Sequence, residues 1–218
     1  RSVSAFLLNR SSDLAWSNPS KVKRFSDLLK GYDVEFVTLK DLAITDEPEE
    51  NGTTPEENAI AKAKFYGQYF EVVICNDSGL YFEELALDDV RQPGLNVRTP
   101  MQMDRLSDEE MIDYYSKLID TLGGKVSAYY LDGIAVYYHG TIYSFMDADE
   151  AKKTGSFYMI GKASSKRFEV WPLDSLSMNK ETGKYFVDGS MEESKENIIK
   201  DEYEKEIVDF LTKSLHIA

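Results

Sequence analysis

This sequence has little cysteine and no long apolar run, and we expect no secretory leader. Cys75 is the single cysteine among 218 residues, which excludes an internal disulfide. Its apolar neighbours predict a buried, reduced thiol in a cytoplasmic protein. No run approaches the roughly 18 apolar residues that cross a bilayer, and residues 1–9 turn polar too early for a signal peptide. We therefore expect a soluble cytoplasmic protein without a membrane partner.

Positive charge is also in short supply. The chain has 39 acidic and 25 basic residues, a formal net charge of −14. Long-range repulsion disfavours nonspecific binding to nucleic acids and to anionic membranes. A small phosphorylated ligand is not excluded, because a few lysines, backbone N–H groups and a divalent cation can hold it locally. We expect no nucleic-acid partner.

Hydrophobic residues are plentiful enough, at 42% of the chain, to build a large core. The sequence has no internal repeat and no linker, so we expect one domain over residues 1–218. Helical periodicity, capping residues and β-rich runs predict helices that alternate with strands in the N-terminal part of the chain, followed by a β-rich region. This order favours an α/β fold with a mixed sheet. The predicted helices are 19–29, 55–68, 108–122 and 192–215. The predicted strands are 34–39, 72–75, 126–138, 141–146, 156–160 and 168–170.

The first cluster of candidate site residues is the polar turn at 17–21, which leads into the first predicted helix. Exposed N–H groups and the helix dipole favour phosphate at such a place, and Lys21 adds a positive charge. Many helices begin in this way without binding an anion. Local sequence leaves both interpretations open.

The second cluster is the acidic loop 46–50 together with the helix that follows it. Its carboxylates offer oxygen ligands for a hard divalent cation, although a solvated acidic loop has the same composition. Asn58 and Lys62 are four residues apart and share one helix face. Lys62 either extends its ammonium to solvent or reaches a phosphate.

The third cluster is 76–80, Asn-Asp-Ser-Gly-Leu, which we expect at the carboxyl end of a short buried strand. Ligands usually bind at that edge of an α/β sheet. Gly79 allows a turn or the close approach of a ligand. The same four polar residues also suit an ordinary turn, so a structural role stays open.

Taken in order, these clusters resemble the inosine-triphosphate pyrophosphatase family. The family begins with a Thr-x-Asn-x-x-Lys turn, matched by residues 16–21, with Trp16 in place of the threonine. The acidic loop, Gly-Thr and Glu-Asn-Ala helix of the family match residues 49–63, and its Asp-Asp-Ser-Gly-Leu strand matches 76–80. A Pro-Gly pair followed by arginine matches Pro93, Gly94 and Arg98. The resemblance covers 14–98, whereas 99–218 diverges.

The resemblance implies a mixed central β-sheet flanked by helices, in two lobes with the active-site cleft between them. It implies a Mg²⁺-dependent hydrolase that converts a nucleoside triphosphate to the monophosphate and pyrophosphate, working as a homodimer. Position by position, it assigns Mg²⁺ to Glu49 and Asp77 and catalysis to Glu49, Lys62 and Asp77. The substrate-binding residues that we expect are Ser17, Asn18, Lys21, Lys62, Ser78, Gly79, Arg98, Phe168 and Trp171.

Two departures from the family pattern concern the base and the metal. The family's Gly-Phe-Gly-Tyr-Asp-Pro and Ser-His-Arg segments are missing. Phe168 and Trp171 either offer aromatic faces for a base or belong to the hydrophobic core, as most buried aromatic residues do. We therefore expect altered base selectivity, for a nonstandard purine or another base. Asn76 replaces an acid, which predicts that Asn76→Asp raises Mg²⁺-dependent turnover. The alternative function is a catalytically weak nucleotide-binding or regulatory protein on the same scaffold.

Overall fold

The computed structural model describes residues 3–8, 19–37, 46, 48–146, 155–168, 171–188 and 198–217. The chain divides into two compact units that are discontinuous in sequence. Unit 1 comprises Arg1–Ser78, Asp132–Asp147 and Ile199–Ala218, and unit 2 comprises Gly79–Leu131 and Ala148–Ile198. None of the helices in the described part of the chain has the length and apolar character needed to cross a membrane.

The strands of unit 1 combine parallel and antiparallel pairing. Strand β1 (Val3–Leu8) pairs in parallel with β2 (Val34–Val37) and with β3 (Val72–Phe82), with Val3 opposite Val34 and Phe6 opposite Val73. Strands β4 (Lys125–Tyr138) and β5 (Thr141–Met146) form an antiparallel hairpin. The strand order is β2-β1-β3-β4, and β5 pairs with β4. The predicted mixed sheet flanked by helices is confirmed.

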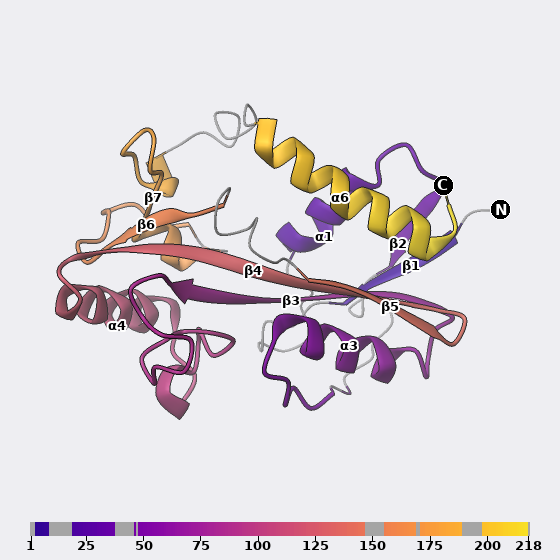
Figure 1. The fold of residues 1–218 in the computed structure, drawn as a ribbon, viewed down its shortest axis with the longest axis horizontal. Coiled ribbons are helices and arrows are strands. Elements are labelled where there is room, and N and C mark those ends of the chain that lie inside the picture. The colour runs from indigo at the N-terminus through magenta and orange to yellow at the C-terminus, as the bar shows by residue number, and fades with distance from the viewer. Residues whose placement is uncertain are drawn as a thin grey trace. The chain divides into compact units, whose positions relative to one another are not determined.

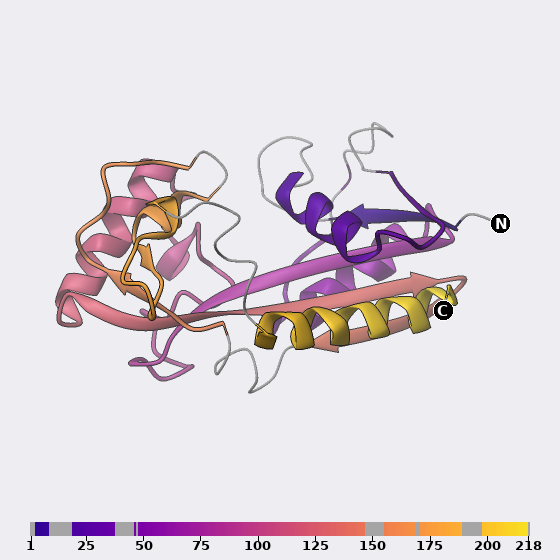
Figure 2. The same cartoon turned by 90° about the horizontal axis from the view of Figure 1, so that it is seen from above.

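Helices cover both faces of the sheet in unit 1 (Figures 1 and 2). Helices α1 (Pro19–Leu28) and α6 (Ile198–Leu215) pack on one face against Val72 and Ile74 of β3. Helix α3 (Pro55–Tyr66) packs on the other face against Val73 and Cys75. Successive residues of β3 therefore alternate between the two layers, as the pleat of a strand requires.

The sequence fixes where α3 begins. Thr54 accepts a hydrogen bond from the Glu57 N–H through its side chain, and Pro55 occupies the first turn. The Thr54 side chain satisfies one of the N–H groups that lack a partner at a helix start, and Pro55 has no N–H to satisfy. Gly133 on β4 lies so close to this turn that a Cβ would overlap main-chain atoms of Pro55 and Glu56. Glycine at 133 thus allows the amino end of α3 to contact β4.

Unit 2 has its own core. Helix α4 (Asp108–Thr121) begins with the predicted capping box, in which Ser107 and Glu110 bond reciprocally. It buries Met111, Tyr115 and Ile119 against the ends of β3 and β4. Strand β6 (Phe157–Ile160) pairs with β4, and β7 (Ser177–Met178) pairs with β6. The described part of the unit also contains the 3₁₀ turns η1 (Pro100–Gln102), η2 (Pro172–Ser175) and η3 (Phe186–Asp188).

Three sequence predictions about elements need correction. The strand predicted at 72–75 continues to Phe82, so 76–79 is the middle of a strand and not a turn at its end. The first thirteen residues, to which we assigned no element, contain β1 between β2 and β3. Phe168 is not in a strand. The described part of the last helix begins at Ile198. Residues 192–197, which we predicted as the start of this helix, lie outside the described range.

Candidate active site

Helix α3 directs two polar side chains into the interior of unit 1. Asn58 and Lys62, one turn apart, are each only 2% exposed. A lysine ammonium buried to this extent needs compensating negative charge and hydrogen bonds. The predicted shared face of these two residues is therefore present, and it faces the sheet instead of solvent.

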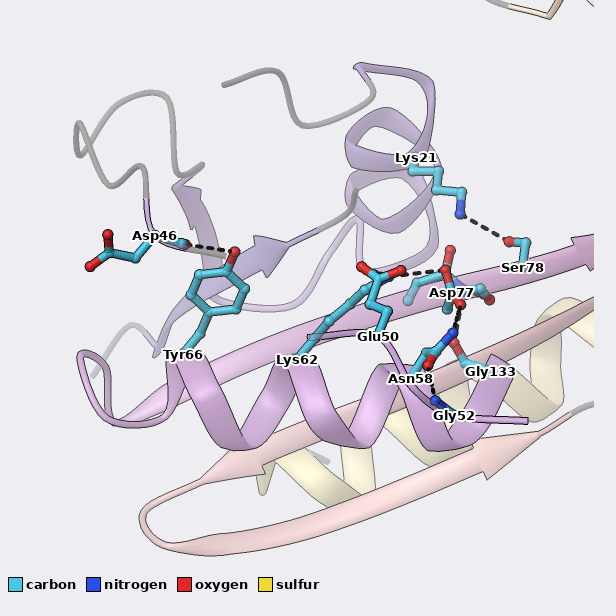
Figure 3. Close-up of polar contacts among 11 residues, drawn as sticks. Lys21, Asp46, Glu50, Gly52, Asn58, Lys62, Tyr66, Asp77, Ser78 and Gly133 are labelled. Carbon is cyan, nitrogen blue, oxygen red and sulfur yellow. Dashed lines mark hydrogen bonds and ion pairs between the residues drawn. The ribbon is translucent and has the colours of Figure 1, made fainter. Parts of the chain in front are cut away.

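Asp77 on β3 supplies that negative charge. Its Oδ1 accepts from Lys62 Nζ at 2.9 Å, and its Oδ2 accepts from Asn58 Nδ2 at 2.9 Å. Asn58 Oδ1 in turn accepts from the Gly52 N–H at 2.9 Å, which links the acidic loop to the helix. Figure 3 shows these side chains converging between α3 and β3. The Asp77 carboxylate is thus fixed by two neighbours that are themselves held by a rigid helix.

The structure brings Glu50, and not Glu49, to this cluster. Glu50 Oε1 lies 3.3 Å from Lys62 Nζ, and the Glu50 side chain is 18% exposed. Glu49 is exposed, and its carboxylate accepts from Asn51 Nδ2 at 3.0 Å. The geometry therefore favours Glu50 as the loop carboxylate of the site. Sequence reasoning missed it because neighbouring glutamates are indistinguishable until the loop conformation is known.

Helix α1 contributes Lys21 from the opposite face of the sheet. Its Nζ donates to Ser78 Oγ at 2.9 Å (Figure 3). Burial lowers the pKa of Lys21 to about 8, although the nearby carboxylates of Asp132 and Asp77 act to raise it. The structure therefore gathers Lys21, Lys62, Asp77 and Ser78, four of the predicted site residues, around one stretch of β3.

Two charged residues near Lys21 escaped the sequence analysis. Asp132 on β4 accepts a hydrogen bond from Ser78 Oγ at 2.5 Å and pairs with Arg24 Nη1 at 2.6 Å. Burial acts to raise the pKa of Asp132, but Arg24, Lys21 and the Ser78 hydroxyl together hold it below its usual range. The available signal was an acid within the apolar and aromatic run of 126–138. Nothing in the sequence indicated its partners.

Asn76 has a structural environment that the sequence did not suggest. It is 1% exposed, and its Nδ2 donates to the carbonyl oxygens of Gly133 at 3.0 Å and Asp77 at 3.1 Å. These contacts need the amide N–H groups, which a carboxylate does not have. The structure therefore argues against the expectation that Asn76→Asp improves the site.

The other predicted binding residues lie in unit 2 or outside the described range. Gly79 is buried in β3, where a Cβ would meet the ring of Tyr81. Arg98 pairs with Asp108 at 2.8 Å and also donates to the Leu106 carbonyl at 3.4 Å. Phe168 is 38% exposed, and the Trp171 N–H donates to its carbonyl at 3.1 Å. Ser17 and Asn18 lie outside the described residues.

A divalent cation is compatible with the carboxylates of unit 1. The Asp77 and Glu50 oxygens lie within 3.3 Å of the same Lys62 ammonium, so the two carboxylates are close together. No group of three or more potential His, Cys, Asp or Glu ligands occurs among the described residues. Mg²⁺ does not need one, because it binds through one or two carboxylates, water and substrate phosphates. Glu50 and Asp77 would hold such an ion.

The family of the protein follows from comparison with known sequences. Residues 14–152, more than half of the chain, match the Ham1 family. The chain belongs to the Ham1 family. This membership confirms the family predicted from the ordered motifs around Lys21, Lys62 and Asp77.

Curated relatives of this Ham1 family member are similar over only part of their length. A dITP/XTP pyrophosphatase from Caldanaerobacter subterraneus subsp. tengcongensis is 43% identical over 84 residues, 38% of this chain and 40% of the relative. The dITP/XTP pyrophosphatase of Bacillus subtilis is 40% identical over 82 residues, 36% of this chain and 40% of the relative. The matched segment thus spans about two fifths of these relatives.

Solved structures extend the similarity to nearly the whole fold. The Ham1 protein of Staphylococcus aureus superposes with a TM-score of 0.67 at 19% identity, covering 97% of this chain and 99% of that one. A Ham1 protein from Coxiella burnetii gives a TM-score of 0.70 at 18% identity over the same shares. The Ham1 family member therefore has the fold of these proteins, including the part whose sequence diverges.

Proposed function

We propose that this Ham1 family member hydrolyses a nucleoside triphosphate to the nucleoside monophosphate and pyrophosphate. The arrangement of Asp77, Lys62 and Lys21 on adjoining elements of unit 1 carries the proposal. Two relatives named dITP/XTP pyrophosphatases support a nonstandard purine as the base. The alternative is a base selectivity that differs from theirs. It is supported by the absence of the family's Gly-Phe-Gly-Tyr-Asp-Pro and Ser-His-Arg segments from the C-terminal half.

In this proposal, the cluster in unit 1 handles the triphosphate and the attacking water. A carboxylate has about four acceptor positions, and Asn58 and Lys62 occupy two of those on Asp77. The others accept a proton from water or bind a cation. Lys62 and Lys21 neutralise phosphate charge, which grows on the leaving pyrophosphate as water attacks the α-phosphorus.

Magnesium is the cation that we propose for Glu50 and Asp77, where it would supply Lewis-acid stabilisation of phosphate oxygens. The family resemblance had assigned this role to Glu49. Substitution of each glutamate separately distinguishes the two assignments. Asn18 and Ser17 stay proposed phosphate contacts, and the Ser78 hydroxyl accepts a hydrogen bond from Lys21. Gly79, Arg98, Phe168 and Trp171 stay proposed contacts to the nucleoside. We also propose a homodimer in the cytoplasm, on the family resemblance alone.

The decisive experiment measures pyrophosphate release from a panel of nucleoside triphosphates, including dITP and XTP, with and without Mg²⁺. We expect metal-dependent release from at least one of them. Asp77→Asn should abolish it, whereas Asp113→Asn should not, because Asp113 forms an exposed pair with Lys117 on α4. Nucleotide binding without any hydrolysis would reject the enzyme and favour the regulatory nucleotide-binding protein.

A further inference from the structure

Four polar residues of unit 1 form a chain of contacts that links Lys21, a residue of the proposed reaction, to two residues that the reaction does not use, Asp132 and Arg24. Lys21 Nζ donates to Ser78 Oγ at 2.9 Å, and Ser78 Oγ donates to Asp132 Oδ1 at 2.5 Å. The second oxygen, Asp132 Oδ2, accepts from Arg24 Nη1 at 2.6 Å. Because a hydroxyl has a single proton, Ser78 donates to Asp132 and accepts from Lys21. This orientation directs the hydroxyl toward Asp132, and not toward a nucleotide.

We propose that Asp132 is a positioning residue for Lys21, which it holds in place through the Ser78 hydroxyl while Arg24 holds the carboxylate. The inference rests on the proposed role of Lys21 in binding the triphosphate. Lys21 and Arg24 are one turn apart on α1, so the Asp132 carboxylate contacts this helix directly at Arg24 and, through Ser78 of β3, indirectly at Lys21. Asp132 itself does not contact the substrate.

Charge gives Asp132 a second effect on the lysine. The groups that act on Lys21 are the carboxylates of Asp132 and Asp77, which favour its ammonium form, and the cations Lys62 and Arg24, which oppose it. The Asp132 side chain is only 14% exposed, so its charge is weakly screened. Burial alone would lower the pKa of Lys21 further than its value of about 8. Asp132 therefore keeps Lys21 protonated near neutral pH.

Two physical descriptions of Asp132 predict opposite results. If its charge acted only on the ligand, Asp132→Asn would tighten binding of a polyanion by removing repulsion. If it acts through Lys21, the same change lowers the pKa of the lysine and weakens binding at alkaline pH. Asparagine keeps an oxygen for the Ser78 hydroxyl, so this variant tests charge, whereas Asp132→Ala removes both the charge and the contact.

The test measures binding of inorganic tripolyphosphate by calorimetry at fixed Mg²⁺ concentration, from pH 6 to pH 9. A change of one unit in the Lys21 pKa makes Asp132→Asn bind about 10-fold more weakly than native protein at pH 9, and within about 2-fold at pH 6. Lys21→Arg carries a positive charge at every pH of the series. Any pH dependence of binding that remains in this variant comes from the titration of tripolyphosphate. Asp27→Asn removes a carboxylate from the exposed face of α1 and should match the native protein at every pH. Asp132→Glu should largely restore the native profile.

The outcomes separate this inference from the proposed function. Tighter binding by Asp132→Asn, or equal weakening at all pH values, overturns the positioning role even if the native protein releases pyrophosphate. A native protein that releases no pyrophosphate, yet binds tripolyphosphate with the Asp132-dependent profile, rejects the enzyme and keeps the inference. No binding of tripolyphosphate by the native protein overturns both.

Discussion

At the scale of single residues, the site depends on which of two similar side chains the fold selects. Glu49 and Glu50 are chemically identical neighbours, but only Glu50 approaches Lys62. Asn76 and Asp77 are also neighbours, but the alternation of β3 directs them to opposite faces. Asp77 meets α3, whereas Asn76 contacts main-chain carbonyls. Substitutions at the two glutamates and at Asn76 test these assignments.

Neutralising the loop glutamates should separate their roles. We expect Glu50→Gln to lower turnover by about 100-fold or more, because it removes a carboxylate beside Lys62 and Asp77. Glu49→Gln, which alters an exposed carboxylate, should change turnover by less than about 3-fold. Steady-state pyrophosphate release across a range of Mg²⁺ concentrations checks both. The reverse ranking would restore the assignment made from the sequence.

Introducing an acid at position 76 should destabilise the protein, contrary to the sequence-based expectation of higher turnover. Asn76→Asp replaces the Nδ2 amide group, which donates to both carbonyls, with an oxygen that faces the Gly133 and Asp77 carbonyl oxygens, at a cost of about 2 kcal/mol. Urea unfolding measures the loss. The control is Asn179→Asp, because Asn179 uses its side-chain oxygen as an acceptor, which aspartate retains. Higher turnover with unchanged stability would contradict this account.

At the scale of elements, the position of α3 on β4 sets the geometry of the buried lysine. Helix α3 carries Asn58 and Lys62, and its first turn lies against Gly133. Capping by Thr54 was predictable from the sequence, because it depends on residues three positions apart. The contact with Gly133 was not, because it joins elements that are distant in the chain.

Filling the space at Gly133 should separate α3 from β4. Gly133→Ala would place a methyl group against main-chain atoms of Pro55 and Glu56, and we expect a loss of about 3 kcal/mol in unfolding free energy. The neighbouring Ile134→Val, a buried change without overlap, should cost about 1 kcal/mol. Urea unfolding measured on both variants gives the comparison. Equal losses would mean that the helix contact tolerates a side chain.

At the scale of the whole molecule, the sequence places a large acidic excess on a chain whose two units have separate cores. Most carboxylates of the described residues are exposed, but Asp174 in η2 of unit 2 is partly buried. Burial raises the pKa of this carboxyl to about 7. Its ionisation therefore opposes folding over the range in which the unfolded chain is already ionised.

The stability of the protein should thus depend on pH through Asp174. The folded state retains a proton that the unfolded state loses near pH 4, so stability falls as pH rises from about 4 to about 7. Asp174→Asn should remove this slope and raise unfolding free energy at pH 8 by up to about 4 kcal/mol, since one unit of pKa shift corresponds to about 1.4 kcal/mol. Thermal unfolding at pH 5 and pH 8 checks it. A gain at pH 5 as large as that at pH 8 would exclude the ionisation as its source.

The sequence by itself determined several helices, the β4–β5 hairpin and the family. Capping boxes, glycine stops and apolar periodicity depend on near neighbours, and they predicted α1, α3, α4 and the β4–β5 hairpin. Ordered motifs around Lys21, Lys62 and Asp77 indicated the inosine-triphosphate pyrophosphatase family, which the match to the Ham1 family confirms. Local sequence did not predict β1 or the full length of β3, because strands are stabilised by partners far away in the chain.

Tertiary structure alone decided which charged groups meet. The pairing of Asp132 with Arg24 joins residues 108 positions apart, and the choice of Glu50 over Glu49 depends on how a loop folds against α3. The chemistry of each side chain is present in the sequence. Its pKa, its partners and its burial are not, because electrostatic energy depends on distance and solvent exposure, which exist only once the chain has folded.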